Sequence, residues 1–341
     1  MMRLHFLSLA AIAAVVVSCC QSETVKSSTV SRKMSGMYPI VTNDKWGYMD
    51  SEGKSVITPR YDAALAFSEG LGAVMVGGRK GTWGFINETG QNAVKPVYDT
   101  VLPFSEGLAA VKSGEKWGFV DASDKVVFEP KFDQAMPFSE GLAAVHVGER
   151  SGSWGYIDKN CKLVINPQFT EAGSFKDGLA NVQKDKKWGF INTKGEFAIA
   201  AQFDEAVQFS GELAAVRIGR TWGFVNKTGE LVIMPQFETV GNFSDGLARV
   251  REGKQWGYID GKGNFAINKQ FDDALDYAEG LAAARVGAKW GFIGTDGKFV
   301  ITPQYDVASS FQGGLAHVVN DKLMGYVDKT GKYVWRQAAK Q

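Results

Sequence analysis

Residues 107–138 read GLAAVKSGEKWGFVDASDKVVFEPKFDQAMPF, and this stretch decides the fold class. Residues 108–111 are small and apolar in an alternating pattern that is compatible with a β-strand, and residues 113–115 predict a turn. Residues 117–121 predict a second strand, because the large side chains of Trp117 and Phe119 occupy alternate positions and share one face. The small Gly118 between them would let a neighbouring backbone or ring approach closely.

The second half of the stretch continues the same pattern. An Asp-x-x-Gly type of turn follows the second strand, and residues 126–128 predict a third strand. Pro130 is expected to end that strand, because proline cannot donate to a β-ladder. Residues 132–139 predict a shorter fourth strand. The stretch therefore predicts three or four short strands, with no helical period.

This unit recurs along the chain. The dipeptide Trp-Gly returns at spacings of 34 or 37 residues, and a ninth copy has Met324-Gly325 in its place. The two longer units carry extra residues near 77–82 and 148–153, where we expect surface loops. The tryptophans of the repeat, which we expect to pack between units as structural residues, are Trp46, Trp83, Trp117, Trp154, Trp188, Trp222, Trp256 and Trp290.

The repeat predicts an all-β fold over residues 37–341, in nine copies of which the last is truncated. A helical-hairpin repeat of similar length is excluded, because its helices would not tolerate a Gly or Pro every few residues. A propeller-like ring of β-meander blades is favoured, since closure removes exposed sheet edges. An open superhelical stack of β-meanders is a close alternative. No unit is split between the two ends, so no strand from one end is expected to complete a blade at the other.

The unit can be written W-G-[FY]-[IV]-[DN]-x-x-G-x-x-[VAF]-[IV]-x-P-x-[FY]-D followed by F-S-E-G-L-A-x-V. It resembles the bacterial WG-repeat family, over residues 37 to about 335. The resemblance implies an all-β repeat architecture and brings no assigned enzymatic activity.

The N-terminus predicts export. An apolar stretch at 6–17 follows Arg3 and is too short to span a membrane, as expected for a signal peptide at 1–18. Val16-Val17-Ser18-Cys19 resembles a bacterial lipobox, which implies cleavage before Cys19 and lipid attachment there. Residues 19–36 predict a flexible tether. We therefore expect a protein that is lipid-anchored in the cell envelope, with the outer membrane favoured.

Composition excludes several function classes. Lys and Arg total 38 and Asp and Glu total 37, so the formal net charge is +1, which argues against nucleic acid as the main partner. Three cysteines and three histidines argue against a disulfide framework and a multi-histidine metal enzyme. The turn residue Cys161 has no activating partner nearby in sequence. We expect no catalytic residue, no metal and no cofactor.

The hairpin before each Trp-Gly is variable and often basic, whereas the turn after the repeated Phe is acidic. A regular array would place the two charges on different sides. The basic side is either a binding surface for a polyanion or a charged protein, or simply a solvated edge of the array. The candidate binding rim consists of Arg79, Lys80, Lys116, Lys186, Lys187, Arg220, Lys254 and Lys289.

These observations favour a non-enzymatic, lipid-anchored envelope scaffold that binds an envelope protein or a glycan through its repeats. Two alternatives remain open. One is a carbohydrate-active or sugar-binding envelope protein, since exposed tryptophans at regular spacing can stack on sugars and paired carboxylates can converge in space. The other is a passive structural spacer.

Overall fold

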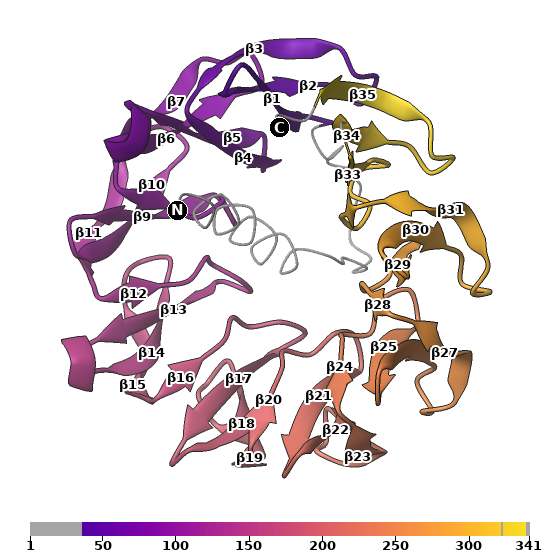
Figure 1. Ribbon diagram of the computed structural model, residues 1–341. Helices are drawn as coiled ribbons and strands as arrows, with labels where there is room; N and C mark the ends of the chain where they lie inside the picture. Colours follow the sequence, from indigo (N-terminus) through magenta and orange to yellow (C-terminus); the bar gives the residue numbers. More distant parts are fainter. Residues whose placement is uncertain (1–35, 322, 339–341) are drawn as a thin grey trace, which may run out of the picture.

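The chain forms a closed ring of β-sheets. The computed structural model describes residues 36–321 and 323–338, and in them 35 strands form nine antiparallel sheets. Figure 1 shows these sheets as the blades of a propeller, with the described ends of the chain in neighbouring blades. The favoured propeller is therefore confirmed and the open array is not what forms. The signal peptide, Cys19 and nearly all of the tether lie outside the described residues.

Blade 1 has three strands and every other blade has four. Blade 1 contains β1(Tyr38–Thr42), β2(Lys45–Met49) and β3(Ser55–Tyr61), and blade 2 contains β4(Ala63–Ser68), β5(Leu71–Val76), β6(Thr82–Asn87) and β7(Asn92–Tyr98). Blade 3 contains β8(Thr100–Val101), β9(Leu108–Ser113), β10(Lys116–Asp121) and β11(Val126–Phe132), and blade 4 contains β12(Gln134–Ala135), β13(Leu142–Val147), β14(Ser153–Asp158) and β15(Leu163–Phe169). Two short 3-10 turns, η1(Gly78–Lys80) in blade 2 and η2(Glu149–Ser151) in blade 4, lie at the expected insertions.

Blades 5 to 9 repeat the same four-stranded pattern. Their strands are β16(Glu171–Ala172), β17(Leu179–Lys184), β18(Lys187–Asn192) and β19(Phe197–Phe203); β20(Glu205–Ala206), β21(Leu213–Ile218), β22(Thr221–Asn226) and β23(Leu231–Phe237); β24(Thr239–Val240), β25(Ala248–Glu252), β26(Gln255–Ile259) and β27(Phe265–Phe271); β28(Asp273–Ala274), β29(Ala282–Val286), β30(Lys289–Ile293) and β31(Phe299–Tyr305); β32(Val307–Ala308), β33(Ala316–Asn320), β34(Leu323–Val327) and β35(Tyr333–Ala338).

Each blade is a meander, so its connections alternate between two faces of the ring. The hairpins between second and third strands lie on one face, together with the links from each blade to the next; we call this the hairpin face. The turns between first and second strands and between third and fourth strands lie on the other, the turn face. The first strands lie nearest the middle of the ring and the fourth strands form its rim (Figure 1). Among the described residues, no helix is long and apolar enough to cross a membrane.

Close backbone packing explains the glycine of Trp-Gly. A Cβ on Gly118 would lie 2.4 Å from the Phe128 carbonyl oxygen and 2.8 Å from the Pro130 nitrogen, both on the fourth strand of the same blade. The predicted close approach at this glycine is thus confirmed. The expectation that Pro130 ends its strand is wrong, because β11 continues through it to Phe132 across a register shift. Proline is tolerated there because β11 is an edge strand and the bulge leaves its nitrogen outside the ladder.

One aromatic pair is repeated between blades. The residue two after each Trp packs against an aromatic residue that precedes the second strand of the next blade, as Phe119 does on Phe138 at 5.0 Å between ring centroids. The other seven pairs lie at 4.7–4.9 Å, and they are Tyr48–Phe67, Phe85–Phe104, Tyr156–Phe175, Phe190–Phe209, Phe224–Phe243, Tyr258–Tyr277 and Phe292–Phe311. These rings form the core of each interface and stabilise it by burial and by edge-to-face geometry.

The ring closes where blade 9 meets blade 1, a junction that we call the seam. No described strand from either end joins the sheet of the other, as expected. The Tyr326 hydroxyl donates to the Pro39 carbonyl at 2.9 Å, and the Tyr38 hydroxyl donates to the Gly313 carbonyl. The Tyr38 and Tyr326 rings lie 5.6 Å apart, which is wider than the regular pairs. Closure therefore depends on side-chain contacts.

Candidate functional site

On the hairpin face, the carboxylate that follows the fourth strand joins neighbouring blades. The Asp133 carboxylate accepts hydrogen bonds from the backbone N–H groups of Gly148 and Glu149 at 2.9 Å, in the hairpin of the next blade. It also accepts one from Lys116 Nζ at 2.5 Å, in its own blade. The same backbone bond is made by Asp62, Asp99, Asp204, Glu238, Asp272 and Asp306. The repeated carboxylate is a latch between hairpins.

This latch includes three members of the candidate rim. Lys116, Lys187 and Lys289 pair with Asp133, Asp204 and Asp306 at 2.5–2.6 Å. The hydrogen bond from Lys116 Nζ holds the pKa of the Asp133 carboxyl below its usual range, and the same bond raises the pKa of Lys116. These lysines have a partner within the ring, and their charge is offset by it.

The other five rim residues lie at hairpin tips. Arg79 and Lys80 lie in η1, where the three extra residues of blade 2 extend its hairpin. Lys186, Arg220 and Lys254 lie at the tips of the consecutive blades 5, 6 and 7, and all five side chains are exposed. The structure thus divides the eight residues into three latch lysines and five exposed tip cations.

The acidic turn face carries a second latch. The Glu106 carboxylate accepts the N–H of Gly141 at 3.0 Å, in the matching turn of the next blade. Glu106 has a backbone φ of +54°, a conformation that residues other than glycine rarely adopt. The cost of this conformation is offset by the bond to the next blade. The same bond is made by Glu69, Glu140, Asp245 and Glu279. The regular acidic series therefore has a structural function.

The tryptophan series lies between core and surface. Trp154 and Trp256 are buried, whereas Trp117 is half-buried and packs against the core cluster of Phe119 and Phe138. Trp256 also has the Arg249 and Arg251 guanidinium groups 5.1 and 5.6 Å from its ring centroid. The rings contact their own protein over much of their surface, as packing residues do.

Blades 5, 7 and 9 differ from the rest near the middle of the ring. In blades 3, 4, 6 and 8 the large apolar residue just after the first strand pairs with an alanine of the second, as the Leu102 N–H donates to the Ala110 carbonyl. In blade 7 that pair is Gly241 and Arg249, and a Cβ on Gly241 would lie 2.6 Å from the arginine Cγ. Arg249 Nε donates to Asp276 of blade 8 at 2.7 Å. The corresponding pairs in blades 5 and 9 are Gly173–Asn181 and Ser309–His317.

The described histidines and the internal cysteine do not gather into one site. Burial lowers the pKa of the His317 imidazole. Cys161 adopts a φ of +61° at its turn and packs against the core cluster of Phe128. Within residues 36–321 and 323–338, no group of three or more His, Cys, Asp or Glu side chains is arranged to hold a metal ion.

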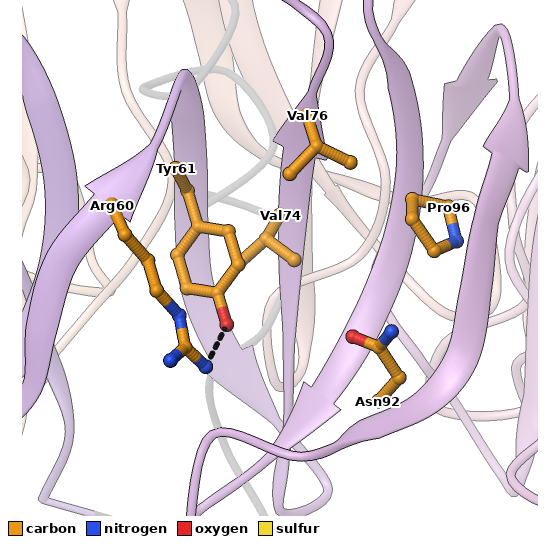
Figure 2. Close-up of a pocket in the computed structure, with 6 residues that line it drawn as sticks. All are labelled: Arg60, Tyr61, Val74, Val76, Asn92 and Pro96. Atoms are coloured by element: carbon orange, nitrogen blue, oxygen red, sulfur yellow. Dashed lines mark hydrogen bonds between the residues drawn. The ribbon is translucent and has the colours of Figure 1, made fainter.

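A cavity of about 340 Å³ opens between blades 1 and 2. Its walls are the Tyr61 ring of β3, Val74 and Val76 of β5, and Pro96 of β7, and Arg60 and Asn92 also line it. Figure 2 shows Arg60 alongside Tyr61, with Asn92 and Pro96 on the opposite side. Arg60 Nη2 donates to the Tyr61 hydroxyl and to the Gly90 carbonyl, each at 2.8 Å.

The sequence pattern did not predict this cavity, although one position of the repeat contains the signal for it. Asn92 is the first residue of a fourth strand, nine positions after its Trp, and other blades have large apolar residues there. Those residues are Val126, Leu163, Phe197, Leu231, Phe265, Phe299 and Tyr333. Blade 1 has Ser55 at this position, and a second cavity of about 360 Å³ lies beside Ser55 and Trp335 at the seam. A comparison of the copies at this one position would have found both.

Comparison with known protein families identifies the repeat. The sequence matches the WG containing repeat family eight times, at residues 46–79, 83–117, 117–149, 154–188, 188–221, 222–256, 256–290 and 290–323. These matches cover most of the chain. The chain belongs to the WG containing repeat family.

Eight family repeats give nine blades because repeat and blade are offset. Each WG repeat supplies the third and fourth strands of one blade and the first and second strands of the next. The strand β1 before the first repeat completes blade 1, and β34 and β35 after the last one complete blade 9. Among the described residues, blade 1 consequently has no first strand.

Several solved structures are similar to the chain at low sequence identity. The chain resembles a eukaryotic initiation factor at 12% identity and a TM-score of 0.48, covering 89% of this chain and 85% of that one. It resembles the dihydro-heme d1 dehydrogenase NirN, in complex with DHE, at 12% identity and a TM-score of 0.48, covering 94% and 76%. Kluyveromyces lactis Hsv2p matches at 10% identity and a TM-score of 0.42, covering 80% and 95%. None of the curated proteins compared with the chain matches it.

Proposed function

We propose that this WG-repeat propeller is a non-enzymatic binding scaffold of the bacterial cell envelope, held to the membrane by a lipid on Cys19. Its partner is an envelope protein or glycan that contacts the hairpin face. One observation carries the proposal: Arg79, Lys80, Lys186 and the other tip cations are exposed, whereas the repeated charges beside them are paired in latches. Variable tips on a rigid repeat are where such proteins usually carry recognition.

The proposal is tested by capture from solubilised envelope. The five tip cations are changed to serine together in one variant of the full chain. The matched control changes five exposed lysines next to the turns of the other face, namely Lys54, Lys125, Lys162, Lys298 and Lys332. We expect one stoichiometric partner that wild type and control retain, that salt elutes, and that the tip variant loses. Equal retention by the tip variant would contradict a hairpin-face site.

The anchor is tested separately. Cys19→Ala is expected to release the chain from membranes and to abolish labelling with a fatty-acid probe. Persistent labelling and membrane association of that variant would contradict the lipobox assignment.

A further inference from the structure

The cavity between blades 1 and 2 is a vacant copy of a position that side chains fill elsewhere in the ring. In blade 5 the Phe197 ring packs on Phe169 of blade 4, at 6.2 Å between centroids and 87° between planes. Blades 7, 8 and 9 repeat this geometry at 6.1–6.4 Å and 83–90°, in the pairs Phe237–Phe265, Phe271–Phe299 and Tyr305–Tyr333. In blade 2 the short Asn92 stands where this ring would be.

The filled copies show what fits the vacant one. Tyr61 lines the cavity at the position that Phe169 has in blade 4, where it receives the Phe197 ring. Val74, Val76 and Pro96 supply apolar walls. The volume of about 340 Å³ lies within the range of small-molecule sites, which is roughly 300–1,000 Å³. An aromatic ring set edge-on against Tyr61 would reproduce a contact that the fold makes four times.

The polar groups at this cavity add a preference for an anion. Arg60 occupies a position that is glutamine in blades 4 to 8, and its guanidinium carbon lies 5.1 Å from the Tyr61 ring centroid. Only Nη2 of Arg60 hydrogen-bonds to the described residues, so Nε and Nη1 remain available to a ligand. A guanidinium binds a carboxylate through two parallel N–H groups.

We propose that this cavity binds an aromatic ring that carries a carboxylate on a short link, with the ring on Tyr61 and the carboxylate at Arg60. Two sources supply this chemistry, a free aryl-alkanoic acid and the C-terminal aromatic residue of a peptide. The site involves none of the hairpin tips, so it stands or fails independently of the proposed scaffold function.

The test is a titration of the full chain, purified in detergent, with N-acetyl-phenylalanine. Binding is followed by calorimetry and by saturation-transfer NMR on the ring protons of the probe. A probe of this size is expected to bind with a Kd of roughly 0.1–5 mM. N-acetyl-phenylalanine amide is expected to bind at least about tenfold more weakly, because it lacks the charge for Arg60. A tripeptide that ends in Phe distinguishes the two sources: tighter binding than that of the free acid assigns the peptide terminus, and weaker binding assigns the small acid.

Four variants locate the site. Asn92→Phe installs the residue of blades 5, 7 and 8 and is expected to abolish binding without lowering Tm, whereas Asn92→Ala leaves the cavity open and keeps it. Arg60→Gln, the residue of blades 4 to 8, is expected to weaken the acid about tenfold or more and to leave the amide unchanged, and Arg60→Lys to restore part of the loss. Undiminished binding by Asn92→Phe, or no binding by wild type at 10 mM probe, overturns the proposal.

Discussion

Eight of the nine interfaces between blades are built in the same way, and the ninth, the seam, is built differently. Each regular interface has an aromatic pair at 4.7–5.0 Å and a carboxylate latch on at least one face, and four of the eight have latches on both faces. At the seam the pair is replaced by Tyr38 and Tyr326 at 5.6 Å, because the part of blade 1 that the structure describes contains no first strand to supply the partner. The seam core contains four buried residues among those described, against eleven in the cluster around Trp154. The repeated sequence supplies similar contacts at eight interfaces, whereas the first and last blades are joined by contacts that the repeat does not supply.

Substitutions in the aromatic core of a regular interface are expected to cause the largest loss in the free energy of unfolding. Phe138 is fully buried between Phe119 and Phe128. Phe138→Ala should lower the free energy of unfolding by about 3–5 kcal/mol, because it removes a large apolar side chain and leaves a cavity. Tyr38→Ala at the seam should cost less. Urea denaturation followed by tryptophan fluorescence measures both, and equal losses would mean that the seam is as strong as a regular interface.

The glycine of Trp-Gly tests the packing within one blade. Gly118→Ala should destabilise the protein by about 1–3 kcal/mol, because its Cβ would collide with backbone atoms that cannot move aside. Gly261→Ala is the matched control, since its Cβ would meet nothing within 4 Å. Thermal unfolding of both variants distinguishes a steric effect from a general effect of alanine. A stable Gly118→Ala protein would show that the fourth strand can shift.

The hydrogen bonds of the seam are expected to contribute less. Tyr326→Phe removes the bond to the Pro39 carbonyl and should cost about 0.5–1.5 kcal/mol. Amide hydrogen exchange gives the sharper comparison. Peptides from β1 and β35 should exchange before those of blade 5, and the variant should widen this difference. Uniform exchange around the ring would contradict a weak seam.

The smallest effect is expected at a single latch, and pH reveals it. The folded pKa of Asp133 lies below its unfolded value of about 3.9, so its stabilisation is present above that pH and is lost as pH falls through the folded pKa. Asp133→Asn should cost up to about 1 kcal/mol near pH 7, since such pairs are partly solvated. The Tm difference between wild type and variant should vanish near pH 2. A difference that stays constant with pH would exclude a contribution from the charge.

Local chemistry made much of this protein predictable. The alternation of large residues around Trp117 and the turn residues depend on neighbours within a few positions, and they predicted the strands. The repeat spacing predicted the array, and the cost of exposed sheet edges favoured a propeller over an open stack. The failure at Pro130 has the same origin. Whether a proline ends a strand depends on whether its nitrogen points toward a neighbouring strand or away from the sheet. Only the arrangement of the sheet shows that β11 is an edge strand.

The sequence by itself determined an all-β array of WG units with the approximate positions of its strands and turns, because a repeated local pattern folds repeatedly into the same unit. It favoured a closed ring over an open array, and the tertiary structure decided between the two. Only the tertiary structure decided what the repeated charges do, since Asp133 meets a hairpin 15 residues further along the chain. It also decided that Asn92 faces Tyr61 of the preceding blade and leaves a cavity there. Contacts between blades depend on the angle at which successive sheets pack, and that angle becomes fixed only when the ring closes.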